Sequence, residues 1–273
     1  MSRGFGAVYG VNTSDYVRTG LLTSGSDRRS YFIWAYRHGV GGNNSGLIFS
    51  KNTPEGATAS ELFYWDNTFG CLKYDRSNAS NVQTSRTRLI LSGVSGLADI
   101  WFSLLLTHDQ SSGALTSPFL YYNGVVNNSQ QVTTGFTATS NNTDPYLIGN
   151  GKQPTSFPQA WDGFLAHFTV WDNVILGQYE ALALHSGVHP MSIAPVNCVS
   201  YFPLDGIHNP EVNFYPGSPH ATVSGSRFGV LQPPRVPMYI ASRNRPREAA
   251  FWQAAAAAAV PAPQQQYGVS VIT

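Results

Sequence analysis

The sequence is poor in charged residues. Aspartate, glutamate, lysine and arginine make up 11% of its 273 residues, against roughly 25% in an average soluble protein. The net charge is +1, so no overall field recruits nucleic acid or a basic partner. Disorder does not explain the shortage, because hydrophobic residues make up 42% of the chain and supply a core. We therefore expect a folded domain with an uncharged polar surface, of the kind found on virions or outside cells.

Targeting and membrane segments are lacking as well. The opening, MSRGFGAVYG, contains no apolar run of the roughly 7–15 residues that a secretory signal needs, and residues 4–6 read as a flexible start. No stretch of about 18 apolar residues is present to span a membrane. We expect a protein made in a host cytoplasm without a signal peptide, with no membrane partner.

Cysteine is scarce. Cys71 and Cys198 are the two cysteines, and neither a C-x-x-C motif nor a Cys/His metal spacing occurs. Apolar and aromatic residues flank both, which favours two buried free thiols. The sequence leaves open whether the two form a disulfide.

Signatures of catalysis are missing. The chain has no G-x-S-x-G nucleophile elbow and no phosphate-binding glycine loop. Glycoside hydrolysis needs two facing carboxylates, but the five glutamates show no paired arrangement: Glu55, Glu61, Glu180, Glu211 and Glu248. We predict that the protein is not an enzyme, and a glucanase-like hydrolase ranks third among its functions.

The chain does contain short aromatic and β-branched runs, separated by turns rich in Gly, Asn and Ser. Residues 99–107 are nearly continuously apolar, as in a strand buried inside a sandwich. Asn123-Gly124 is a strong hairpin signal. The other predicted strands are 30–37, 45–50, 61–65, 71–74, 87–92, 118–122, 131–139, 146–148, 163–171 and 199–203. One short helix is expected at 176–186, with Gly187 as its stop.

The character of the sequence changes after residue 230. Prolines and arginines come first, then six consecutive alanines within a predicted helix at 248–260, and a predicted strand at 267–273. Such a segment cannot build its own core, so we divide the chain into a domain at 1–230 and an extended arm at 231–273. We expect the arm to dock on a partner, with a solvated linker as the alternative. Its docking residues would be Arg235, Arg243, Arg245, Arg247, Phe251, Trp252 and Tyr267.

A family resemblance rests on residues 161–172, WDGFLAHFTVWD. They resemble the G-x-(I/L)-x-(E/D)-(V/F)-x-(I/V)-(Y/W)-(N/D) strand of laminin-G-like and concanavalin-A-like jelly rolls. In that family a short helix, a G-x-x-P loop (here 187–190) and an L-x-x-Y-x-P-L strand (here 198–204) follow. The Y-x-N-G and L-x-I-G elements resemble 121–124 and 146–149. The resemblance implies an all-β, two-sheet antiparallel jelly-roll sandwich with one short helix. It says little about function, because this fold hosts lectins, pentraxins, glucanases and structural domains.

The two ends of the chain look like those of laminin-G-like proteins carried by tailed bacteriophages and prophages. This looser resemblance implies a non-enzymatic virion protein, most naturally a capsid decoration or head-surface protein present in many copies or as a homo-oligomer. Its partners would be capsid or other virion proteins, and glycan binding would be weak. The alternative is a glycan-binding adhesin of a tail or fibre. Nucleic acid is disfavoured as a partner because no recognition motif accompanies the arginines.

Two kinds of ligand are worth weighing. Calcium is the one cofactor considered, with oxygens from Asp144, Asn142 and Asp162, although such residues also serve turns. A sugar would stack on Trp65, Tyr64 and Trp161, which lie near loops, although aromatic residues in sandwiches are mostly core. Trp34, Trp101 and Trp171 are expected in the core.

Overall fold

The computed structural model of the chain describes residues 2–5, 15–20, 28–42, 45–51, 61–77, 83–89, 98–109, 118–127, 145–151, 159–229 and 231. All of them belong to the first of two compact units, Met1–Tyr239. The predicted strand at 131–139 lies outside the described residues. So does the arm beyond residue 231, with its docking residues Arg235, Arg243, Arg245, Arg247, Phe251, Trp252 and Tyr267. The arm therefore stays a prediction.

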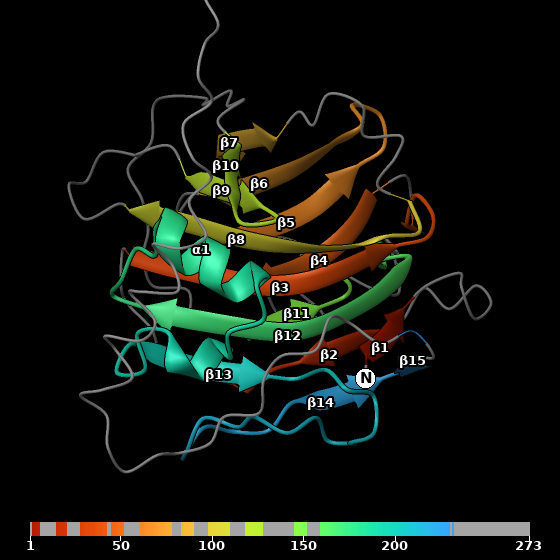
Figure 1. Ribbon diagram of the computed structural model, residues 1–273. Coiled ribbons are helices and arrows are strands. Elements are labelled where there is room, and N and C mark those ends of the chain that lie inside the picture. The colour runs from red at the N-terminus through yellow and green to blue at the C-terminus, as the bar shows by residue number, and fades with distance from the viewer. Residues whose placement is uncertain are drawn as a thin grey trace, which may run out of the picture. The chain divides into compact units, whose positions relative to one another are not determined.

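The described residues form two antiparallel sheets, which confirms the predicted all-β sandwich. The first sheet lies in front in Figure 1 and runs in the order β10-β9-β8-β3-β12-β1-β15, with β13 also paired to β12. Its strands are β1 (Ser2–Phe5), β3 (Arg28–Arg37), β8 (Trp101–Asp109), β9 (Phe119–Tyr122), β10 (Val125–Asn127), β12 (Gly163–Asp172), β13 (Cys198–Phe202) and β15 (Arg227–Gly229).

The second sheet lies behind the first in Figure 1 and runs in the order β14-β2-β11-β4-β5-β6-β7. Its strands are β2 (Tyr16–Arg18), β4 (Ser45–Lys51), β5 (Glu61–Asp66), β6 (Cys71–Ser77), β7 (Gln83–Leu89), β11 (Tyr146–Ile148) and β14 (Thr222–Ser224). Neighbours in the order are often far apart in sequence, as expected of a jelly roll.

The start of the chain is a strand, so the interpretation of residues 4–6 as flexible is wrong for Gly4 and Phe5. β1 pairs with β12 on one side and with β15 on the other. Phe5 is fully buried in the core, and Arg3 forms a buried ion pair with Glu211 at 2.6 Å. Both strand partners lie more than 150 residues away, which is why no local pattern indicated the strand.

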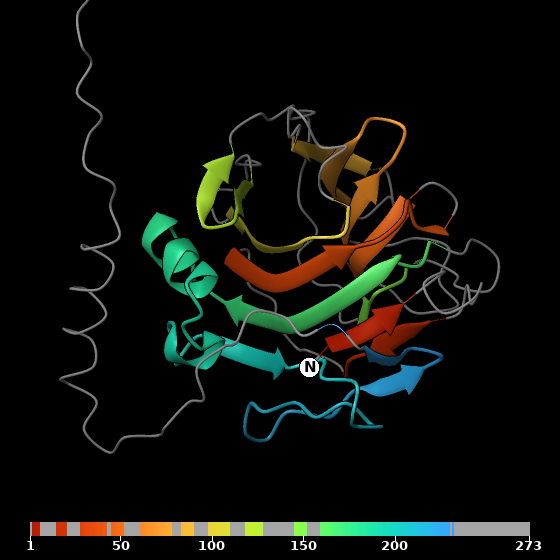
Figure 2. The ribbon, with the colours of Figure 1, turned by 45° about the vertical axis from the view of Figure 1, so that its right-hand side comes forward.

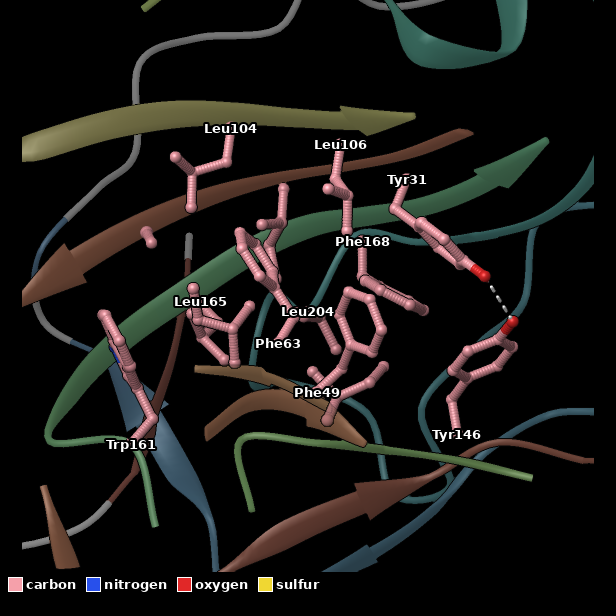
Figure 3. Close-up of a cluster of buried hydrophobic side chains, with 14 of the residues drawn as sticks. Tyr31, Phe49, Phe63, Leu104, Leu106, Tyr146, Trp161, Leu165, Phe168 and Leu204 are labelled. Carbon is pink, nitrogen blue, oxygen red and sulfur yellow. Dashed lines mark hydrogen bonds between the residues drawn. The ribbon is translucent and has the colours of Figure 1, made fainter. Parts of the chain in front are cut away.

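The core fills the space between the two sheets (Figure 3). Because side chains alternate between the two faces of a strand, inward residues of each sheet meet at this layer. Phe49, Phe63 and Tyr146 of the second sheet meet Tyr31 and Phe168 of the first. Aromatic pairs at these separations add to the stability that the buried apolar area provides.

The helix predicted at 176–186 is confirmed as α1, Gln178–His185. Glu180 accepts a hydrogen bond from the Gly177 backbone N–H and so caps the helix. α1 lies on the outer side of the first sheet (Figure 2), where it shares a second apolar cluster with Trp34 and Trp171. None of the helices that the structure describes is long and apolar enough to cross a membrane.

Cys71 and Cys198 are free thiols and both are buried. Burial raises the pKa of the Cys198 thiol to about 12. The thiol is therefore protonated and unreactive at neutral pH, and it packs as a small apolar group.

An ion pair also joins the two sheets inside the sandwich. Arg29 of β3 donates to Glu61 of β5 at 2.9 Å, and neither side chain is more than 2% exposed. Tyr31 donates to the other oxygen of Glu61 at 2.6 Å, and the Tyr31 and Tyr146 hydroxyls lie 3.1 Å apart. Since β3 and β5 belong to different sheets, these polar contacts fix how one sheet sits over the other.

Candidate functional site

The three aromatic residues predicted to bind a sugar do not share a surface. Trp65 and Trp161 are 3% and 1% exposed and belong to the core between the sheets. Tyr64 points to the other face of β5, where it packs against Leu62 and donates to Asp75 at 2.8 Å. Both indoles therefore serve the core instead of the loop surface near which they stand in sequence, and neither offers its ring to a ligand in this structure.

Of the residues predicted for calcium, Asn142 and Asp144 lie outside the described part of the chain. Asp162 is 9% exposed, and its backbone carbonyl accepts the His38 N–H at 2.8 Å. A Cβ built on Gly39 would lie 1.9 Å from the Asp162 Oδ2, so this carboxylate lies directly against the Gly39 backbone. Among the described residues, no three His, Cys, Asp or Glu side chains are grouped so as to hold a metal ion. Calcium binding stays a prediction.

A different group of side chains gathers where β3 ends and β8 begins, at the right-hand end of the ribbon in Figure 1. Tyr36, His38, Asp99 and Trp101 make up this group, which we call the rim cluster. The side chains of His38 and Asp99 are 56% and 57% exposed, and Tyr36 and Trp101 are partly exposed. These are polar and aromatic groups at a strand end that a ligand can reach.

The backbone holds the two halves of the rim cluster together. The Asp99 N–H donates to the Arg37 carbonyl at 2.7 Å, and Arg37 pairs with Ala98 in an isolated bridge. Asp99 has a φ of 62°, a left-handed conformation that aspartate tolerates better than most residues. The Trp161 indole N–H donates to the Tyr36 carbonyl at 3.0 Å and anchors the end of β3 from below.

The side chains of the rim cluster are joined through one carboxylate oxygen. Asp99 Oδ1 accepts from the Tyr36 hydroxyl at 3.2 Å and from His38 Nδ1 at 2.7 Å. Because an ionised carboxylate only accepts, His38 carries its proton on Nδ1, and in the neutral ring Nε2 is an acceptor. The Tyr36 and Trp101 rings lie 5.7 Å apart, so the aromatic and polar groups form one continuous surface.

The hydrogen bonds set the charge of this surface. The hydrogen bonds from His38 and Tyr36 hold the pKa of Asp99 below its ordinary value, so Asp99 is ionised at neutral pH. Burial and the neighbouring Asp99 raise the pKa of Tyr36, which therefore keeps its proton and remains a donor.

Arg37 lies beneath the rim cluster and does not extend into solvent. Its guanidinium carbon is 4.1 Å from the centre of the Trp65 ring, and the residue is 7% exposed. Burial lowers the pKa of Arg37, while Asp99 and Asp162 oppose this effect. An arginine stays protonated in proteins, so Arg37 is a fixed positive charge on the inner side of the cluster.

The arrangement suits binding better than catalysis. The rim cluster offers aromatic rings and hydrogen-bond acceptors, but a single ionised carboxylate. The three glutamates in the described part of the chain already have structural partners: Glu61 is bonded to Arg29, Glu211 to Arg3, and Glu180 caps α1. Each of these glutamates therefore has a role in holding the fold together.

A second aromatic group surrounds Tyr201 on the first sheet. His167 Nδ1 lies 2.8 Å from the Tyr201 hydroxyl, and the His189 ring lies 4.9 Å from the Tyr201 ring. Burial lowers the pKa of His167 to about 3 and that of His189 to about 4. Both rings are neutral at physiological pH and pack as parts of the fold, so we do not count them as a binding site.

Sequence reasoning missed the rim cluster. Trp101 was expected in the core. It packs against the outer apolar cluster but is partly exposed at the strand end, whereas Trp34 and Trp171 are buried as expected. The signal that was present in the sequence is an aspartate, Asp99, two residues before the strongly apolar strand β8, and an aromatic residue, Tyr36, near the end of β3. That the two strands are neighbours is known only from the structure.

Comparison with known proteins supports the fold. No protein-family model and no curated protein matches the chain. Among solved structures, it is similar to a candidate carbohydrate-binding protein from Bacteroides ovatus, with a TM-score of 0.58 and 16% identity over 86% of this chain and 60% of that one. It is also similar to a heptameric SAP-like pentraxin from Limulus polyphemus, with a TM-score of 0.51 and 14% identity over 82% of this chain and 95% of that one.

A third solved structure, domains LG4-5 of the mouse laminin alpha1 chain, has a TM-score of 0.43 and 10% identity over 62% of this chain and 40% of that one. A TM-score of 0.43 is too low to support a conclusion about this chain. The likenesses to the Bacteroides protein and the pentraxin establish the jelly-roll fold and nothing finer. The chain spans about 60% of the length of the Bacteroides protein, so that protein's activity as a whole does not transfer.

Proposed function

We propose that this chain is a non-catalytic glycan-binding protein and that the rim cluster is its binding surface. The observation that carries the proposal is the contact between exposed acceptors and aromatic rings at Tyr36, His38, Asp99 and Trp101. A sugar presents hydroxyl donors on its edge and apolar C–H groups on its face. Those two features match the carboxylate and the rings of one continuous surface.

Two of the structural likenesses support the proposal. The Bacteroides protein is described as a candidate for carbohydrate binding, and the pentraxin is described as a heptamer. A heptameric relative in fold is compatible with the expectation that this chain acts in several copies. Multiple copies convert a weak affinity for one sugar into strong attachment to a surface.

Replacing Trp101 by alanine tests the proposed surface. We expect glycan affinity to fall about fivefold, since an aromatic contact of this kind contributes roughly 1 kcal/mol. Binding of the full chain to an array of neutral and acidic oligosaccharides, followed by calorimetry on the best ligand, measures the effect. Tyr179→Ala is the matched control, because it also removes an exposed aromatic ring but lies outside the rim cluster. Tyr179 is 63% exposed on α1, which packs on β8 and β10. Unchanged binding by Trp101→Ala would show that the glycan binds outside the rim cluster. A wild-type chain that binds no glycan would overturn the proposal.

We further propose that the protein is a structural component of a phage particle, carried on the capsid or another repeating surface and anchored through residues 231–273. The proposal rests on the composition of that segment, rich in Pro, Arg and Ala, and on the family resemblance of the two ends of the chain. A glycan-binding adhesin of a tail or fibre is the alternative location. In either place the jelly roll would face outward and the arm would face its partner.

Limited proteolysis of the purified full chain, with fragment masses measured, tests the anchoring role. We expect cleavage between about residues 231 and 265 with an intact core domain, since a segment without a core is open to protease unless a partner covers it. Resistance of the whole chain would show that the arm packs on its own domain. In that case the anchoring proposal fails, while the glycan-binding proposal is unaffected.

A further inference from the structure

We infer that the rim cluster selects neutral, hydroxyl-rich sugars and rejects acidic ones such as sialylated or sulfated glycans. This inference rests on the proposed glycan-binding function and names the class of sugar. It follows from which groups of the cluster face the solvent and from whether those groups donate or accept hydrogen bonds.

The carboxylate of Asp99 gives the surface that a ligand meets an exposed negative charge. The Asp99 side chain is 57% exposed. The neighbouring Asp162 adds a second carboxylate that is nearly buried. Arg37 as a whole residue is 7% exposed and its guanidinium is held over Trp65, so it partly balances the carboxylates from below and lies away from the exposed surface.

No exposed arginine on the same strand reverses this balance. β3 carries one exposed arginine, Arg28, at the opposite end from the rim cluster, roughly 26 Å along the strand. Arg28 is itself paired with Asp109 at 3.1 Å. The guanidinium that acidic groups usually require is therefore missing from the exposed part of this site as the structure describes it.

The hydrogen-bonding capacity agrees with the charge. Asp99 Oδ1 is already taken by Tyr36 and His38, and Oδ2 has no partner among the described residues. In the neutral form of the His38 ring, Nε2 is a second acceptor. Two acceptors beside each other suit two hydroxyl groups of a sugar, which can both donate. A carboxylate or sulfate has no proton to donate, so at Asp99 it would meet an acceptor that carries a like charge.

The test compares matched pairs of glycans on the full chain. Lactose and 3′-sialyllactose form one pair, and neutral oligosaccharides with their sulfated counterparts form the others. We expect the neutral member of each bound pair to bind at least ten times more tightly than the acidic member. Asp99→Asn removes the like charge and keeps the shape, so it should bring the two affinities of a pair close together. Asp109→Asn, at the other end of β8, is the matched control and should leave the ratio unchanged.

The outcomes separate this inference from the function on which it rests. If acidic members bind as tightly as neutral ones and binding still depends on Trp101, the selectivity is wrong and the glycan-binding function stands. If the preference for neutral sugars persists undiminished in Asp99→Asn, Asp99 is not its source and the inference fails. If no member of any pair binds, the proposed function itself fails and the inference falls with it.

Discussion

Replacing Glu61 by glutamine should destabilise the domain by about 3 kcal/mol, the lower end of the range found when one partner of a buried ion pair is removed, since Asp172 still pairs with Arg29. Glu61 and Arg29 are 2% and 0% exposed, so neither can turn to water. Arginine cannot lose its proton in a protein, and the substitution therefore leaves the buried charge of Arg29 with Asp172, at 3.5 Å, in place of two carboxylate partners. The Tyr31 hydroxyl would also lose its carboxylate acceptor. Few other single changes in the described residues combine both penalties.

Denaturant unfolding monitored by tryptophan fluorescence measures this effect. Removing both charges, with Arg29→Met and Glu61→Gln together, should recover much of the lost stability, because paired removal of a buried ion pair is often close to neutral. The exposed pair Arg28 and Asp109 provides the control, since Asp109→Asn should cost less than about 1 kcal/mol. If Glu61→Gln costs no more than Asp109→Asn, the ion pair is not buried as the structure has it. If the double variant is as unstable as Glu61→Gln, the buried charge of Arg29 is not the cause of the destabilisation.

Much of the fold was predictable from sequence because its long strands are encoded locally. β3, β8 and β12 are nearly continuous runs of aromatic and aliphatic residues, without the polar face that a surface helix has. Residues typical of turns stand at the ends of each run. The helix was predictable from its spacing and its terminal glycine, Gly187. What could not be predicted are the short strands β1, β2, β14 and β15, of three or four residues each. Their pairing joins segments as distant as Ser2 and Gly229, and nothing local records such a partner.

The site was less predictable than the fold, and strand alternation explains why. Along β5, Phe63 and Trp65 face the core while Leu62 and Tyr64 face the other way. Sequence shows that Trp65 stands near a turn but not which side of the sheet it faces, and a change of one position reverses the answer. The rim cluster adds a second difficulty. Its members come from two segments about 60 residues apart, joined only by the pairing of β3 with β8.

One glycine connects the fold to the rim cluster, and its replacement gives the second large effect. Gly163 opens β12 with a φ of 150°, and a Cβ at this position would lie 1.9 Å from the Tyr36 carbonyl oxygen. No side chain can move aside to relieve the clash, because the atom it meets is backbone. We expect Gly163→Ala to destabilise the domain by about 3 kcal/mol or more, combining the strain of the backbone conformation with that of overpacking.

The same substitution should weaken binding as well as stability, since the Tyr36 carbonyl is the acceptor for the Trp161 indole and Tyr36 belongs to the rim cluster. Gly217→Ala is the matched control: its φ is also positive, at 80°, and a Cβ there meets nothing within 4 Å. It should cost about 1–2 kcal/mol from backbone strain alone and leave glycan affinity unchanged. Thermal unfolding and calorimetry on both variants separate the two contributions. If Gly163→Ala costs only what Gly217→Ala costs, then β3 and β12 have room at this point. The close approach that positions Tyr36 would then not be what shapes the site.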